Sequence, residues 1–158
     1  MLEQIELHPT VALIIHAGDC EEDAEDLRAV YPQYTYACVP GNNDWISREP
    51  TEKLEFFGGK KLFITHGHTY GVKSGLDRLA RRAKEIGADV AVFGHTHIPR
   101  MEFVNGIWLV NPGVATKSCA LLTVEDGEIR IDMIGKNISK IEKVLKKTIG
   151  FYEEKLEG

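Results

Sequence analysis

Cysteine, basic charge and long apolar runs are all scarce in this sequence. Its three cysteines, Cys20, Cys38 and Cys119, are widely spaced and form no Cys-x-x-Cys pair, which argues against a disulfide framework and against a thiolate zinc site. Residues 1–9 lack the apolar stretch of a secretory leader, and no apolar run reaches membrane-spanning length. These absences predict reduced thiols, a cytoplasmic location and no membrane partner.

Acidic residues outnumber basic ones. The 158 residues include 19 lysines and arginines and 24 aspartates and glutamates, which gives a net charge of −5 at pH 7. General nucleic-acid binding is therefore not expected, because binding to phosphate backbones depends on clustered basic side chains. The densest acidic stretch, residues 19–26, favours cations instead. A chain of this length suits one domain that buries roughly 70% of its unfolded surface.

The apolar patterning predicts an α/β chain that ends in β-hairpins. Apolar runs predict strands at 11–15, 35–39, 54–57, 61–65 and 90–93, and the first is expected to be buried on both faces. Helical spacing predicts helices at 23–30 and 74–86, the second capped by Ser74 and ended by Gly87. Four further strands, at 100–104, 107–110, 120–124 and 128–134, are joined by turns at Asn105-Gly106 and Asp126-Gly127.

Both ends of the sequence predict helices. Residues 1–7 are typical of the end of a helix that stops before Pro9. An apolar stripe within 138–156 predicts a terminal amphipathic helix. We therefore expect a domain at 1–135 and a helix at 136–158 that packs on it or on a second subunit. A homodimer through this helix is one hypothesis.

Polar side chains follow several of the apolar runs. The segments concerned are His16-Ala17-Gly18-Asp19, Gly41-Asn42-Asn43-Asp44, His66-Gly67-His68 and Gly94-His95-Thr96-His97. Because sites in open α/β sheets form where strands end, we expect these side chains to gather at one edge. Carboxylate, amide and imidazole donors suit manganese, iron, zinc, nickel or cobalt. Two such ions roughly 3.5–4 Å apart could clamp a phosphoryl group.

Together with Asn111-Pro112-Gly113, these segments stand in the order found in the calcineurin-like metallophosphoesterases, and the chain resembles their YfcE-like phosphodiesterase branch. The resemblance implies a four-layered α-β-β-α sandwich around two divalent ions, with manganese the first choice and nickel, zinc, iron or cobalt as alternatives. It also implies hydrolysis of small phosphate esters, above all phosphodiesters, by a metal-bound hydroxide.

The same resemblance implies the metal ligands. Asp19 would bridge both ions. Asn42, His66 and His95 would complete the shell of one ion, and His97 would bind the other. In the family that other ion also takes ligands from an Asp-x-His segment at the end of the opening strand, and no such segment precedes residue 11 here. We therefore expect a sandwich without its first strand and most of its first helix. The alternative function is a catalytically impaired or inactive scaffold, like the phosphoesterase-like subunit of retromer.

Two residues are candidates for catalysis, His68 and Asn43. Asn43 stands where many relatives carry a histidine that protonates the leaving group, and asparagine cannot act as an acid at neutral pH. His68 could take part of that role or only support the ligands. His8 and His16 fit no ligand position and are expected to be structural. Asn111-Pro112-Gly113 is expected to be a turn or part of the site wall.

Overall fold

The computed structural model describes residues 6–8, 10–19 and 21–135. Within these residues, Glu6 and Leu7 are helical. The predicted helix at 136–158, and with it the hypothesis of a homodimer, lies outside the described residues, as do residues 1–5 of the predicted first helix. None of the described helices is long and apolar enough to cross a membrane.

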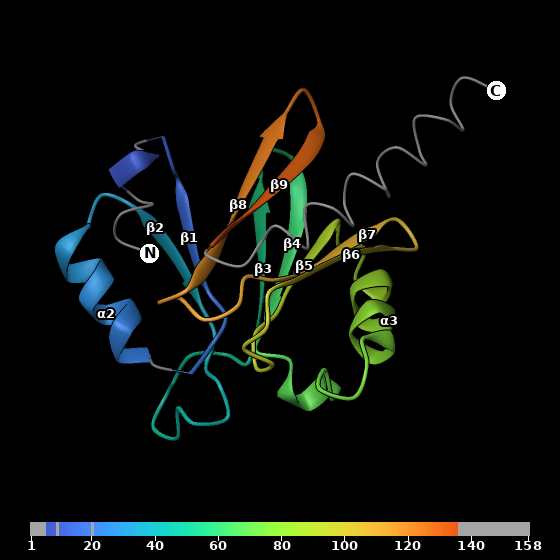
Figure 1. Cartoon of the computed structure of the whole chain (residues 1–158), viewed down its shortest axis with the longest axis horizontal. Coiled ribbons are helices and arrows are strands. Elements are labelled where there is room, and N and C mark those ends of the chain that lie inside the picture. Colours follow the sequence, from blue (N-terminus) through green and yellow to red (C-terminus); the bar gives the residue numbers. More distant parts are fainter. Residues whose placement is uncertain (1–5, 9, 20, 136–158) are drawn as a thin grey trace.

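The central layer is a five-stranded mixed sheet in the order β3-β4-β5-β7-β6 (Figure 1). Its strands are β3 (Glu52–Phe57), β4 (Lys60–Thr65), β5 (Val90–Val92), β6 (Arg100–Val104) and β7 (Ile107–Asn111). The middle strands β4, β5 and β7 run parallel, while β3 and β6 run antiparallel at the two edges. All three residues of β5 are buried, as expected for the centre of such a sheet.

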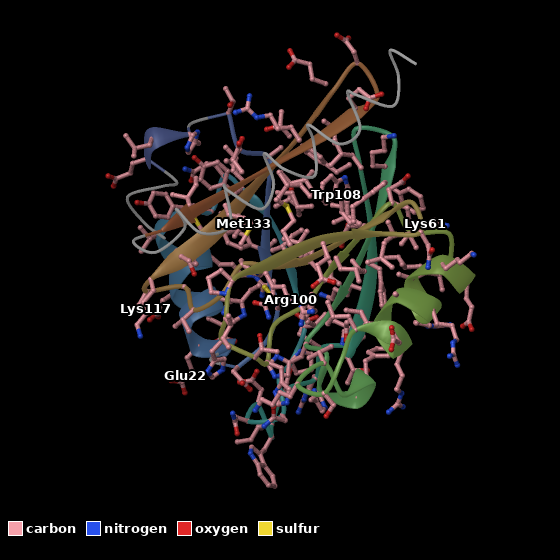
Figure 2. The ribbon with its side chains drawn as sticks, turned by 45° about the vertical axis from the view of Figure 1, so that its right-hand side comes forward. Glu22, Lys61, Arg100, Trp108, Lys117 and Met133 are labelled. Atoms are coloured by element: carbon pink, nitrogen blue, oxygen red, sulfur yellow. The ribbon has the colours of Figure 1, made fainter. Side chains whose placement is uncertain are left out.

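Two smaller sheets face this layer. Strand β1 (Leu13–His16) pairs in parallel with β2 (Thr35–Cys38), and β8 (Ser118–Glu125) pairs antiparallel with β9 (Glu128–Gly135). The core between the layers includes Ala37, Ile64, Val92 and Met133. Figure 2 shows Met133 among the side chains in the interior of the molecule. Apolar side chains from both layers therefore interdigitate, as they do when sheets pack face to face.

Helices cover the outer faces of the sheets. Helix α2 (Glu21–Val30) packs on β1 and β2 through Leu27, which contacts Ile14. Helix α3 (Asp77–Glu85) packs on the five-stranded sheet through Leu79 and Ala83. The two helices lie on opposite sides of the molecule with the sheets between them (Figure 1). This arrangement is an α-β-β-α sandwich, and the predicted fold class is confirmed.

The first predicted strand differs from expectation. It runs from Leu13 to His16, and only Ile14 is buried, so the prediction of burial on both faces is wrong. Among the described residues, the neighbour to which β1 is hydrogen-bonded is β2 alone. Leu13 and Ile15 instead line an apolar groove of about 770 Å³, whose other wall includes Leu122 of β8. Within the described part of the chain no strand other than β2 pairs with β1, which accounts for its partial exposure.

The start of the helix at 74–86 is also corrected. Helix α3 begins at Asp77 after Leu76, and no side chain caps it, so Ser74 is not its N-cap. The backbone N–H of Ser74 instead donates to the carbonyl of Gly71, in the turn that follows the short 3₁₀ helix η1 (His68–Tyr70). The predicted stop at Gly87 is confirmed, because this residue has φ of +66° after the last turn of the helix.

Both hairpin turns form as predicted. Asn105 and Gly106 have φ of +53° and +85°, and Asp126 and Gly127 have φ of +51° and +81°. Positive φ at both central residues is the geometry of a type I′ turn, which Asn-Gly and Asp-Gly favour. The turn at Asn105-Gly106 returns the chain along β7, and this strand ends at Asn111 beside the polar cluster described next.

Candidate metal centre

Four loops bring the predicted polar residues together at one end of the molecule, the lower end in Figure 1. They follow the carboxyl ends of β1, β2, β4 and β5. Because β1 and β2 are parallel, and β4 and β5 are parallel, the ends of each pair meet on the same side. The residues gathered there are Asp19, Asn42, His66 and His95. The clustering expected at one edge is therefore present in the structure.

His66 lies at the centre of the cluster. Its side chain is 1% exposed, and its Nδ1 lies 2.7 Å from the carbonyl oxygen of Ala17. A carbonyl only accepts hydrogen bonds, so Nδ1 carries a proton, which leaves Nε2 as the nitrogen that can bind a metal ion. Nε2 faces Asn42 Oδ1 at 3.1 Å, His95 Nδ1 at 3.2 Å and Asp19 Oδ2 at 3.4 Å.

The cluster contains several hydrogen-bond acceptors at close range. The Asn42 oxygen and the Asp19 carboxylate only accept, and both lie within 3.4 Å of His66 Nε2. The ligand atoms of Asp19, His66 and His95 all lie within 4.8 Å of one another. Converging acceptors repel unless a proton or a metal ion lies between them, and mixed oxygen and nitrogen donors suit a divalent cation. The donor set therefore fits the group that the sequence predicts.

The surroundings of His95 favour its neutral form, which can bind a metal ion through a lone pair. Burial is the main factor that lowers the pKa of His95, and the positive charge of Lys73 lowers it further. The neighbouring imidazoles of His66 and His68 act in the same direction, while Asp19 opposes them. A histidine with a lowered pKa is neutral at physiological pH and keeps a lone pair available.

His97 also lies near the Asp19 carboxylate. Its Nε2 is 3.8 Å from Asp19 Oδ2, and its side chain is 64% exposed. Asp19 Oδ2 thus lies within 4 Å of both His66 and His97, as a carboxylate shared between two ions would need. Of the five predicted metal ligands, Asp19 and His97 alone serve this exposed side, so it is the less complete of the two half-sites in the described part of the chain.

The backbone holds the ligand residues in place. Asp19, His95 and His97 have φ of +54°, +65° and +60°, a region that costs free energy for residues other than glycine. Close contacts between loops also require glycine. A Cβ on Gly41 would collide with the carboxylate of Asp19, and one on Gly18 would lie 2.6 Å from His66 Nδ1. The backbone conformation and the close contacts at glycine therefore fix the positions of the candidate ligands.

The loop that carries the two asparagines is fastened by hydrogen bonds. The backbone N–H of Asn43 donates to Asp19 Oδ1 at 3.1 Å. The N–H of Gly41 donates to Asp44 Oδ2 at 2.7 Å, so Asp44 closes the turn that presents Asn42. The exposed amide of Asn43 accepts a hydrogen bond from Asn42 Nδ2 at 3.3 Å. Asn43 thus lies at the rim of the cluster.

His68 lies beside the cluster rather than in it. Its ring centroid is 5.3 Å from that of His66 and 6.1 Å from that of His95. Its Nδ1 is shielded from solvent and has no hydrogen-bond partner among the described residues. Burial, followed by the charge of His66, lowers the pKa of His68. His68 and Asn43, the two predicted catalytic residues, therefore both lie next to the candidate ligands.

The hydrogen bonds by which Asn111 supports the site were not predicted from the sequence. This side chain is fully buried, and its Nδ2 donates to the carbonyl of Gly94 at 2.7 Å and to Thr96 Oγ1 at 2.9 Å. Its Oδ1 accepts the N–H of Gly113 at 2.9 Å. One amide thus joins the loop of His95 and His97 to the turn after β7. A polar residue at the end of an apolar strand was the available signal.

Sequence comparison identifies the family. Residues 1–127 match the calcineurin-like phosphoesterase superfamily domain. The chain belongs to this superfamily. The chain is 37% identical over 142 residues to the probable metallophosphoesterase YsnB of Bacillus subtilis, a match that covers 84% of this chain and 82% of YsnB. Matches to five other curated relatives cover 56% to 62% of their lengths.

Solved structures share the fold. The zinc complex of Vps29 from Entamoeba histolytica superposes with a TM-score of 0.68 at 19% identity, covering 85% of this chain and 87% of Vps29. An archaeal phosphodiesterase superposes with a TM-score of 0.59 at 23% identity, covering 84% of this chain and 90% of that protein. At these identities the likeness establishes the α/β sandwich fold, which both an enzyme and Vps29 possess.

Proposed function

We propose that the chain is a divalent-metal-dependent phosphoesterase of the YfcE-like kind that acts on small phosphodiesters. The observation that carries the proposal is the convergence of potential metal-binding atoms around His66 Nε2, from Asn42, His95 and Asp19. Membership of the calcineurin-like phosphoesterase superfamily supports it, as does the structural likeness to an archaeal phosphodiesterase.

The chain's own residues have distinct tasks in this proposal. Asp19, Asn42, His66 and His95 hold one cation, and Asp19 with His97 offers a second position. Bound divalent cations, with manganese the first choice and nickel, zinc, iron or cobalt as alternatives, would supply a water of lowered pKa and positive charge for the phosphoryl oxygens. The Ala17 carbonyl fixes the His66 ring so that its lone pair faces the cation.

His68 and Asn43 would contact the substrate. Among the described residues the Nδ1 of His68 has no hydrogen-bond partner, so a bound phosphate or water that reached it would complete its hydrogen bonding. Because its pKa is lowered, the protonated ring is scarce at neutral pH but releases its proton readily. The Asn43 amide can donate a hydrogen bond to a phosphoryl oxygen but cannot protonate a leaving group.

The second candidate is a binding scaffold on the same fold. The observation that favours it is the exposed half-site, where Asp19 and His97 are the predicted ligands present among the described residues. The likeness to Vps29 also supports it. A scaffold of this kind would bind a cation or a partner without turnover.

Hydrolysis of bis(p-nitrophenyl) phosphate across a Mn²⁺ titration tests the proposal. We expect saturable, Mn²⁺-dependent turnover that falls by at least about 100-fold in His66→Ala, because that variant loses the central ligand. His8→Ala removes an imidazole that is absent from the donor cluster and serves as the control. Calorimetric Mn²⁺ binding without turnover would favour the scaffold, and the absence of both would contradict the phosphoesterase proposal.

A further inference from the structure

The loop that carries Asn42 and Asn43 also carries the two most exposed large apolar side chains among the described residues. Trp45 is 89% exposed and Ile46 is 93% exposed. Single apolar residues on a surface are ordinary. Two adjacent ones, including a tryptophan, on the loop that supplies a candidate metal ligand call for a functional reason, since leaving them in water forgoes the free energy of burying them.

This loop holds Trp45 close to the metal cluster. The N–H of Asp44 donates to the carbonyl of Gly41 at 3.3 Å, and the N–H of Ser47 donates to the carbonyl of Asp44 at 3.3 Å. Trp45 and Ile46 are the central residues of the second of these hydrogen-bonded turns, and the bond from Asn43 N–H to Asp19 ties the loop to the cluster. Asn43 and Trp45 are two positions apart, so their Cα atoms lie at most about 7 Å apart. Trp45 is therefore close enough to the cluster for a group esterified to a phosphate there to meet its side chain.

A second loop of the cluster also carries an exposed apolar side chain. Ile98 is 66% exposed and directly follows His97, whose Nε2 lies 3.8 Å from Asp19 Oδ2. Exposed apolar side chains thus follow a candidate metal ligand on two different loops. Trp45 and Ile46 follow Asn42 after β2, and Ile98 follows His97 after β5. A substrate held between these loops would meet uncharged apolar surface beyond its phosphate.

We propose that Trp45, with Ile46, forms a platform on which the base of a nucleoside phosphodiester stacks while its phosphate occupies the metal centre. This inference rests on the proposed phosphoesterase function and assigns its substrate class. The exposed face of an indole pairs best with another planar ring, and every nucleobase has such a face. The net charge of −5 disfavours long polyanions, so a mono- or dinucleotide fits better than a nucleic-acid chain.

Fluorescence tests the platform without requiring turnover. The chain has two tryptophans, Trp45 and Trp108, and Trp108 packs on Phe103 with ring centroids 4.9 Å apart. Figure 2 shows Trp108 on β7, toward the opposite end of the molecule from the site loops. In Trp108→Phe, the emission reports Trp45 alone. With Mn²⁺ present, we expect adenosine 5′-monophosphate to quench this emission saturably below about 1 mM, and ribose 5-phosphate, which has no base, to leave it unchanged. Equal quenching by both ligands, or by neither, would overturn the platform.

Kinetics provide the second test. The substrates are thymidine 5′-(p-nitrophenyl phosphate) and methyl p-nitrophenyl phosphate, which share the leaving group. We expect the preference in kcat/KM for the nucleoside ester to fall roughly 10- to 100-fold in Trp45→Ala and to be largely restored in Trp45→Phe. Phe56→Ala is the matched control, because Phe56 is 69% exposed on β3 and away from the loop.

The outcomes separate the two proposals. If no substrate is turned over but adenosine 5′-monophosphate alone quenches Trp45, the platform stands and the hydrolase proposal fails. If both esters are hydrolysed and Trp45→Ala keeps the preference unchanged, the platform is overturned and the hydrolase proposal stands. Quenching by a short-chain lysophospholipid in place of the nucleotide would also overturn the platform, because it would indicate an acyl group as the occupant.

Discussion

His66 joins three loops through one ring. Its Nδ1 contacts the carbonyl of Ala17, and its Nε2 faces Asn42 and His95. A histidine can hold a metal in one orientation only if its second nitrogen is fixed, and here a backbone carbonyl fixes it. The donor geometry therefore depends on where the loop after β1 lies, as well as on the ligands themselves.

Gly41→Ala should weaken metal binding without removing a ligand. The added Cβ would collide with the Asp19 carboxylate and push the loops apart. We expect Mn²⁺ affinity, measured by calorimetry, to fall roughly 10- to 100-fold. Gly75→Ala is the control, since a Cβ there meets open space. An affinity within about twofold of the wild type would contradict this account of the site.

Asn111→Ala should reduce both stability and metal binding. The change leaves the Gly94 carbonyl and the Gly113 N–H without their buried partner. We expect the free energy of unfolding, from urea titration, to fall by about 2 kcal/mol. Asn111→Asp keeps the acceptor for Gly113 but loses both donors, so it should also be destabilised. A loss under about 0.5 kcal/mol in both variants would show that the amide is dispensable.

The sequence allowed the ligand residues to be predicted, but not their support. Each candidate ligand follows an apolar run, and strand ends of one direction meet at one edge, so the clustering of Asp19, His66 and His95 was predictable. The Ala17 carbonyl has no side-chain signature, because any residue supplies the same acceptor. The hydrogen bonds of Asn111 depend on loops that are distant in sequence, which local patterns do not reveal.

Among the elements, those with strong local chemistry were the best predicted. Type I′ turns need positive φ at two residues, and Asn105-Gly106 supplies them directly. The predicted start of α3 was wrong, because Ser74 forms part of the turn after η1, before the helix begins. The predicted burial of β1 on both faces was also wrong. The neighbours of a strand depend on the whole fold, and the apolar sequence of the strand does not specify them.

Gly87→Ala should destabilise the end of α3. Gly87 has φ of +66°, its N–H donates to the Lys84 carbonyl at 3.1 Å, and the N–H of Ala88 donates to the Ala83 carbonyl at 2.9 Å. This pattern is a Schellman motif, whose left-handed residue favours glycine. We expect thermal or urea unfolding to show a loss of about 1 kcal/mol. A substitution that left stability unchanged would mean that the loop relaxes into another helix ending.

At the scale of the whole molecule, the stability of the metal-free protein should depend on pH. Burial lowers the pKa of both His68 and His95 below the usual value of 6.5. As pH falls through 6.5, the unfolded chain therefore takes up protons before the folded one does, and the free energy of unfolding decreases. We expect the urea midpoint in chelator to be lower at pH 5.5 than at pH 8.

His68→Gln is the matched variant for this pH dependence. It removes one of the two partly buried imidazoles whose pKa is lowered, so the difference between the midpoints at the two pH values should shrink. Glu49, whose pKa is lowered by its hydrogen bond to Lys53, acts in the same direction at more acidic pH and is unaffected by the variant. A midpoint that rises between pH 8 and pH 5.5 would contradict the expected protonation order.

The positive φ values at Asp19, His95 and His97 have a kinetic consequence. These residues are held by contacts within the chain, so a cation would enter donors that are already arranged, with little ordering of loops to follow. The rate of association should then be set by how fast the ion sheds its own water. Nickel, whose hydration shell exchanges far more slowly than that of manganese, should load slowly even if it binds tightly, so that exposure time as well as affinity decides which metal the protein carries.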